Sequence, residues 1–149
     1  SSDVCSSDLI PEGPIVELDT LLGLPEVLRQ RQRTFDKTVG LHATGLFTPT
    51  GELVELREDI GRHNAMDKAI GARLMQGESP LHDRLALVSG RAGFELVQKA
   101  AVGGVPILAA VGAPSSIAVD AAKRLGVTLV GFLRDDRCNV YAHTARIAT

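Results

Sequence analysis

Short apolar runs alternate with helical patterns through the C-terminal half of this 149-residue chain, and this alternation constrains the fold more than any other feature. Apolar, strand-like runs cover residues 84–88, 105–110 and 128–133, and helical patterns over residues 93–102 and 115–125 separate them. Apolar runs joined through helices are typical of parallel strands that are buried on both faces. The sequence therefore predicts an α/β fold with a mainly parallel sheet flanked by helices.

The N-terminal half predicts a helix followed by a β-hairpin. An amphipathic helix is expected over residues 26–37, with Pro25 in its first turn. Residues 41–47 and 52–56 form two candidate strands, and the segment Pro49-Thr50-Gly51 between them suits a tight turn. We therefore expect an N-terminal helix and hairpin ahead of the alternating half.

The composition argues against several classes of protein. Sixteen Lys and Arg residues against eighteen Asp and Glu give no positive field for non-specific binding of nucleic acid. No apolar run is long enough to cross a membrane. The two cysteines, Cys5 and Cys138, form no Cys-x-x-Cys pair, so neither a disulfide framework nor a structural zinc site is expected. A reducing, cytoplasmic setting fits this composition best.

The first nine residues, SSDVCSSDL, resemble the translation of a sequencing adapter and carry no apolar period. We expect residues 1–9 to be an artefact that is disordered, and residues 10–149 to form one α/β domain. A flexible native N-terminus is the alternative. The adapter interpretation implies that the chain is the C-terminal part of a longer protein whose upstream part is missing.

Three turns rich in glycine or small polar residues lead into predicted helices, at residues 58–64, 89–93 and 112–116. The last two follow predicted parallel strands, so we expect them at the carboxyl edge of the sheet, where ligands usually bind. Free N–H groups at a helix start attract phosphate. These turns predict a site for a nucleotide or another phosphorylated ligand; the alternative is that the glycines only make tight connections. The candidate residues are Ser89, Gly90, Arg91, Ser115 and Ser116.

The densest polar cluster of the chain contains Arg62, His63 and Asp67, in a helix predicted over residues 61–75. His63 and Asp67 are four residues apart, so they share a face of that helix. They could form an oriented proton-transfer pair or contact a nucleobase or ribose. An exposed helix start with salt bridges is the alternative interpretation.

Two long motifs carry a family resemblance: LREDIGRHNAMDK over residues 56–68 and LVSGRAGFELVQK over residues 87–99. With residues 113–116 and 129–134, they resemble the C-terminal part of the formate dehydrogenase accessory sulfurtransferase family, FdhD, over about residues 10–147. The resemblance implies a cytidine-deaminase-like α/β fold without deaminase chemistry. The segment His42-Ala43-Thr44 agrees, because it lacks the glutamate of the zinc deaminases, and no zinc is expected.

The resemblance also implies a function. Members of the family are cytoplasmic homodimers that accept persulfide sulfur from a cysteine desulfurase and pass it to the molybdenum or tungsten bis-guanine-dinucleotide cofactor of formate dehydrogenase. The family's cofactor-binding segment falls on Phe132, Leu133, Arg134, Asp135, Asp136 and Arg137. The turns at residues 89–93 and 112–116 are expected to complete that pocket, with Arg62, His63 and Asp67 as further candidates.

The Cys-x-x-Cys pair that carries sulfur in the family does not occur in this chain, so the sequence assigns no catalytic residue. The leading interpretation is a sulfur carrier required for formate dehydrogenase activity, of which this chain holds the cofactor pocket. A guanine-nucleotide-binding module without catalysis is the first alternative. A deaminase-like hydrolase, supported only by fold analogy, is the second.

Overall fold

A computed structural model describes residues 13–35, 41–78 and 80–149. The disorder that we predicted for residues 1–9 lies outside the described residues, as does the predicted end of the first helix at residue 37.

The centre of the molecule is a six-stranded sheet in the order β3-β2-β4-β5-β6-β7. The central strands β4, β5 and β6 run parallel, whereas β3, β2 and β7 each pair antiparallel with their neighbours. The α/β class is therefore confirmed, but the prediction of a mainly parallel sheet is wrong, because a hairpin extends each margin of a parallel core. The strands are β2 (His42–Phe47), β3 (Leu53–Asp59), β4 (Leu85–Val88), β5 (Ile107–Ala110), β6 (Thr128–Arg134) and β7 (Arg137–Ala142).

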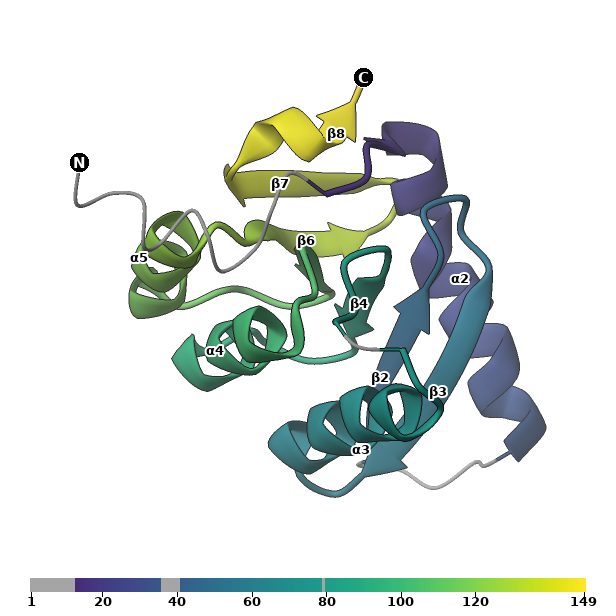
Figure 1. Cartoon of the computed structure of the whole chain (residues 1–149). Coiled ribbons are helices and arrows are strands. Elements are labelled where there is room, and N and C mark those ends of the chain that lie inside the picture. The colour runs from purple at the N-terminus through teal and green to yellow at the C-terminus, as the bar shows by residue number, and fades with distance from the viewer. Residues whose placement is uncertain (1–12, 36–40, 79) are drawn as a thin grey trace.

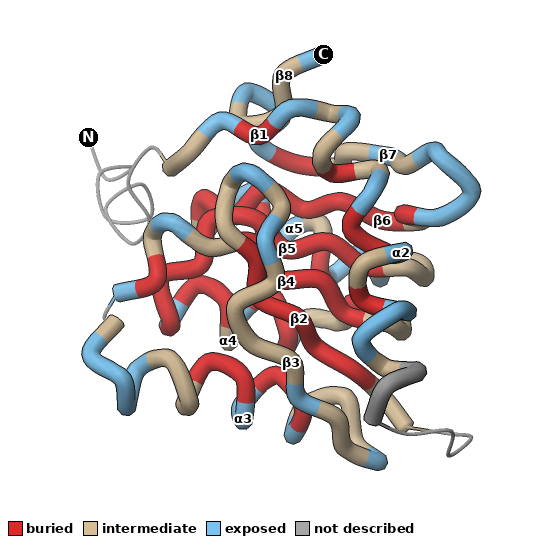
Figure 2. The backbone as a smooth tube through the Cα atoms, turned by 90° about the vertical axis from the view of Figure 1, so that its right-hand side faces the viewer, coloured by how far each residue is buried: buried red, intermediate tan, exposed pale blue. Residues whose placement is uncertain are grey.

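Helices cover both faces of this sheet (Figure 1). Helix α2 packs on one face through buried leucines, and α3, α4 and α5 pack on the other. Strands β2, β4, β5 and β6 are the most deeply buried part of the described chain, whereas the marginal strands β3 and β7 are only partly buried (Figure 2). The helices are α2 (Leu18–Phe35), α3 (Arg62–Met75), α4 (Phe94–Gly103) and α5 (Ser116–Leu125).

A small second sheet joins the two ends of the described chain. Strand β1 (Val16–Glu17) pairs in parallel with β8 (Ile147–Ala148), which follows a 3₁₀ turn, η1 (Thr144–Arg146). The guanidinium of Arg146 donates to the carbonyl oxygens of Pro106 and Gly126, at 3.2 and 2.7 Å. These bonds anchor the C-terminal segment to the starts of the central strands, at the opposite edge of the sheet from the loops described below.

The first helix begins earlier than the sequence predicted. Helix α2 starts at Leu18 and contains Pro25, which the sequence had placed in the first turn. A proline inside a helix costs about 3 kcal/mol. However, Leu21, Leu24 and Leu28 are almost completely buried against the sheet, and each such burial contributes roughly 1.5–3 kcal/mol. Packing against the sheet therefore outweighs the local preference of the proline.

Strand β7, like the short elements β1, η1 and β8, was not predicted from the sequence. The segment Arg134-Asp135-Asp136-Arg137, which the sequence analysis placed in the cofactor-binding segment, is the turn of a hairpin. Asp135 and Asp136 have φ angles of 54° and 59°, the left-handed conformation of both central residues in a type I′ turn. The chain therefore reverses directly after β6 and adds β7 as an antiparallel strand at the margin of the six-stranded sheet.

The other predicted elements are confirmed to within three residues at each end. The hairpin over residues 41–56 forms β2 and β3, with Gly51 in a left-handed conformation in its turn. The predicted limits of α5 are observed: the Ser115 hydroxyl accepts a hydrogen bond from the Ala118 N–H at 3.1 Å, and Gly126 ends the helix with a φ of 81°. The cytidine-deaminase-like arrangement stays a prediction.

Candidate functional site

The predicted loops lie together at the carboxyl edge of the sheet. Strands β4, β5 and β6 run in parallel and end there. Because β2 is antiparallel to both β3 and β4, the pair His42 and Asp59 lies at the same edge. The segments that lead into α4 and α5 therefore start from one edge, as the sequence predicted, and the segment that leads into α3 starts from the same edge.

Backbone hydrogen bonds join the second and third of these loops. The Gly112 N–H donates to the Gly90 carbonyl oxygen at 2.9 Å, and the Ser115 N–H donates to the Ala92 carbonyl oxygen at 3.0 Å. A Cβ atom on Gly112 would lie 3.1 Å from the Gly90 oxygen, closer than nearly all real contacts. The close approach of the two loops therefore explains the glycine at position 112.

Two of the three candidate serines, Ser89 and Ser115, make hydrogen bonds that fix the structure of this edge. The Ser89 hydroxyl accepts a hydrogen bond from the Ala43 N–H at 2.9 Å, which fixes the second loop to β2. Ser115 caps α5. Arg91 and Ser116 are exposed at the same edge. Contact of these residues with a ligand stays a prediction.

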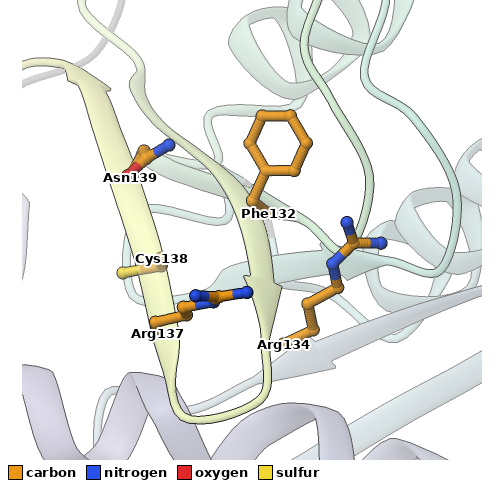
Figure 3. A pocket seen from close by; sticks show the side chains of 5 residues that line it. All are labelled: Phe132, Arg134, Arg137, Cys138 and Asn139. Carbon is orange, nitrogen blue, oxygen red and sulfur yellow. The ribbon is translucent and has the colours of Figure 1, made fainter.

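The β6–β7 hairpin contains a cavity of about 320 Å³ lined by Phe132, Arg134, Arg137, Cys138 and Asn139 (Figure 3). The two arginines come from opposite strands of the hairpin, one before and one after its turn. The Arg134 guanidinium carbon lies 5.6 Å from the centre of the Phe132 ring. The Phe132 N–H donates to the Gly112 carbonyl oxygen at 3.0 Å, so the cavity is joined directly to the loop before α5.

A β-bulge shapes this cavity. Gly131 pairs with Asn139 and Arg134 pairs with Arg137, so Phe132 and Leu133 lie opposite the single residue Cys138. Phe132 adopts a φ of 53°. Because the bulge changes the alternation of side chains along β6, Leu133 lies in the core on the α2 side of the sheet, in the same cluster as Val130.

The predicted cofactor-binding segment thus divides into three parts. Phe132, Arg134 and Arg137 line the cavity. Leu133 is completely buried in the core, and Asp135 and Asp136 form the exposed turn. Two further lining residues, Cys138 and Asn139, were not predicted as site residues, because the sequence analysis did not identify β7. The alternation of Cys138, Val140 and Ala142 with polar residues was the signal that could have revealed the strand.

The remaining predicted site residues, Arg62, His63 and Asp67, lie in α3, and the last two face α4. His63 Nδ1 lies 3.2 Å from Glu95 Oε1, and Asp67 Oδ1 lies 2.8 Å from Lys99 Nζ. Both contacts run from α3 to α4, so His63 and Asp67 each pair with α4 and not with one another. This arrangement agrees with the alternative of a salt-bridged helix start. Arg62 is partly buried in the first turn of α3, and cofactor binding by these three residues stays a prediction.

The hairpin cavity and the start of α3 lie at the same edge of the sheet, but other strands separate them. Two strands, β4 and β5, separate β2 from β6, which amounts to three strand spacings or about 14 Å. A ligand that touched both places would have to span that distance.

Charge distinguishes the two ends of this edge. At the start of α3, the Lys68 ammonium and the Gly61 N–H lower the pKa of Asp59 to about 2, and the Asp59–Lys68 distance is 2.7 Å. A permanent carboxylate thus already occupies the positive end of that helix. The hairpin cavity instead presents two arginines.

Cys138 lines the cavity as a protonated thiol. Burial raises the pKa of this thiol above its ordinary value, and a thiol is a much weaker nucleophile than a thiolate. Within residues 13–35, 41–78 and 80–149, no three His, Cys, Asp or Glu residues lie close enough together to hold a metal ion. The same part of the chain contains no helix that is long and apolar enough to span a membrane.

A family model and individual relatives identify the same family for this chain. The model of the FdhD/NarQ family matches residues 3–148. Proteins named sulfur carrier protein FdhD are 59% identical over 133 residues in Streptomyces avermitilis and 48% identical over 132 residues in Sulfurisphaera tokodaii, and each alignment covers 89% of this chain. These alignments cover 47% and 52% of the two relatives, so the chain spans about half of their length.

A solved structure shows the same fold. The crystal structure described as a formate dehydrogenase accessory protein from Desulfotalea psychrophila superimposes with a TM-score of 0.83 at 30% sequence identity. The superposition covers 93% of this chain and 59% of that chain.

Proposed function

Because the chain belongs to the FdhD/NarQ family, we propose that it is part of a sulfur carrier that serves formate dehydrogenase. In this proposal the carrier takes persulfide sulfur from a cysteine desulfurase. It passes the sulfur to the molybdenum or tungsten bis-guanine-dinucleotide cofactor, which is its cargo and not a resident group. We propose that this chain binds a guanine-nucleotide part of that cofactor.

The observation that carries the proposal is the hairpin cavity, in which two arginines from opposite strands flank an aromatic ring. A guanine dinucleotide combines a planar base with a pyrophosphate. Arginine offers charged, bidentate hydrogen bonds to phosphate, and an aromatic ring offers a surface for a base. The donor set of the cavity thus fits both parts of this ligand, and three of its lining residues, Phe132, Arg134 and Arg137, belong to the segment that the family resemblance implies.

The chain's own residues support binding more than sulfur chemistry. Sulfur transfer needs a nucleophilic thiolate, and the chain contains no Cys-x-x-Cys pair. Its cavity thiol, Cys138, has a raised pKa. The proposal therefore assigns no catalytic residue among those described. These two observations also favour the second candidate, a guanine-nucleotide-binding module that performs no catalysis.

Several finer points belong to the same proposal. We place the carrier in the cytoplasm as a homodimer that contacts the desulfurase and formate dehydrogenase and does not bind nucleic acid. We also retain the cytidine-deaminase-like arrangement as part of it. A deaminase-like hydrolase would need zinc ligands, and the described residues offer no group of three that could supply them.

Calorimetric titration with GDP tests the proposal. The wild-type chain should bind GDP, and Arg134→Gln and Arg137→Gln should each weaken binding about tenfold or more, since a hydrogen bond to a charged group contributes roughly 1.5–3 kcal/mol. Arg124→Gln is the matched control, because Arg124 is equally exposed but lies in the last turn of α5. Absence of GDP binding by the folded wild-type chain, or equal binding by all four proteins, would refute the proposal.

A further inference from the structure

A groove runs between helices α3 and α4, on the side of these helices that faces away from the sheet. It encloses a cavity of about 420 Å³. His63 on α3 contacts Glu95 on α4, and Asp67 contacts Lys99. Both residue numbers rise by four from the first contact to the second, which is about one helical turn. The two helices that form the walls therefore run parallel, side by side.

One half of this groove is charged and the other half is apolar. In the charged half, Asp67 Oδ1 lies 2.8 Å from Lys99 Nζ. In the apolar half, Val102 on α4 is 85% exposed and Leu74 on α3 is 37% exposed. Gly71 leaves the α3 wall low between them, because its Cβ atom would meet nothing within 4 Å. Exposed apolar side chains that line a groove with a polar end are typical of an interaction surface.

We propose that two copies of this chain pair through the α3–α4 groove, about a two-fold axis that runs along it. The inference rests on the homodimer of the proposed function and names the surface that forms it. Such an axis places α3 of each copy on α4 of the other at the same level, with all four helices parallel. Because both helices start at the carboxyl edge of the sheet, the two hairpin cavities then lie at the same end of the dimer.

Charge complementarity identifies a second copy as the occupant of the groove. The two walls carry opposite charges at the same level, so the axis brings Asp67 of each copy to Lys99 of the other. Further along, the exposed Val102 of each copy fits over Gly71 of the other, where the wall has no side chain. An axis across the groove would instead place the charged half of one copy on the apolar half of the other. The charges would then lose water without gaining partners.

The apolar half is tested by sedimentation equilibrium of the full chain at micromolar concentration. The wild-type chain should be a dimer. Val102→Asp should weaken dimerisation about a hundredfold or more, because each dimer would bury the new carboxylate twice. Ile117→Asp is the matched control, because Ile117 is also exposed, at 63%, but lies on α5 and does not line the groove. It should leave the dimer unchanged, and circular dichroism checks that both variants are folded.

The charged half allows a test that separates contacts between copies from contacts within one copy. Asp67→Lys makes both walls positive at this level, and Lys99→Asp makes both walls negative. Each variant alone should dimerise about tenfold or more weakly, because like charges meet across the interface. An equimolar mixture of the two should dimerise as well as wild type, since each positive wall then meets a negative wall of the other chain. A pair that acted only within one copy would show no effect of mixing.

The outcomes distinguish this interface from the proposed function. The interface is overturned, and the homodimer stands, if Val102→Asp dimerises like wild type, if Ile117→Asp weakens the dimer equally, or if the mixture dimerises no better than its separate components. A monomeric wild-type chain overturns both the interface and the homodimer. GDP binding, which tests the proposed function, is measured separately and does not depend on this surface.

Discussion

Substitution of Gly131 by alanine should disrupt the junction on which the candidate site depends. Gly131 lies in β6 directly before Phe132 and is buried. A Cβ atom there would lie 2.6 Å from Pro114 Cδ, in the loop before α5, and 2.9 Å from Tyr141 Cε2, in β7. The Pro114 ring belongs to a loop whose backbone is held by hydrogen bonds of Ala113 and Ser115 with Ala92, so it cannot move away freely. Overpacking of this kind typically costs about 1–3 kcal/mol.

For a chain of this size, that cost corresponds to a Tm lower by about 3–9 °C. GDP affinity should fall as well, because the displaced Pro114 loop is joined to Phe132 through the Gly112 carbonyl. Gly71→Ala is the matched control: its Cβ atom would meet nothing within 4 Å, and in the interior of α3 alanine should stabilise the helix by up to about 1 kcal/mol. The assay is thermal unfolding followed by circular dichroism, with calorimetric titration of GDP. A Gly131→Ala protein that melts at or above wild type and binds GDP normally would refute this account of the junction.

Three further perturbations have clear expected results. Ser115→Ala removes the oxygen that accepts the Ala118 N–H and should cost about 1 kcal/mol, or about 3 °C in Tm; an unchanged Tm would show that the cap contributes nothing. The lowered pKa of Asp59, about 2 against an ordinary 3.8, means that its contribution to stability is present above about pH 4 and is lost as the pH falls toward 2. Asp59→Asn should therefore reduce the acid dependence of unfolding in that window, and identical acid profiles would contradict the assignment. Because burial raises the pKa of Cys138, iodoacetamide should alkylate it at pH 8 more slowly in the native chain than in urea, as followed by peptide mass spectrometry; equal rates would argue against a buried thiol.

The alternating half of the chain was predictable because its signals are local. Apolar runs of strand length predict β4, β5 and β6 without reference to distant residues, and Ser115 and Gly126 mark the two ends of α5 locally. The start of α2 was not predictable in this way. The burial of Leu21 and Leu24 against the sheet, a tertiary effect, overrides the proline at position 25.

The β6–β7 hairpin also could not be predicted from local sequence signals. Two aspartates in left-handed conformations make its turn, and a polar Asp-Asp segment between arginines looks equally like a solvated loop. With β7 missing from the prediction, Cys138 and Asn139 had no reason to be placed opposite Phe132. The bulge that buries Leu133 and leaves Phe132 in the cavity depends on pairing between strands, so the segment could be predicted as a site but its division into core, cavity and turn could not.

The most direct test of the central claim is a crystal structure of the chain grown with GDP. The account predicts one nucleotide in the hairpin cavity, with its base against Phe132 and its phosphates within hydrogen-bond distance of Arg134 and Arg137. A nucleotide bound at the start of α3, beside Asp59 and His63, or crystals that contain no nucleotide at saturating GDP, would contradict it.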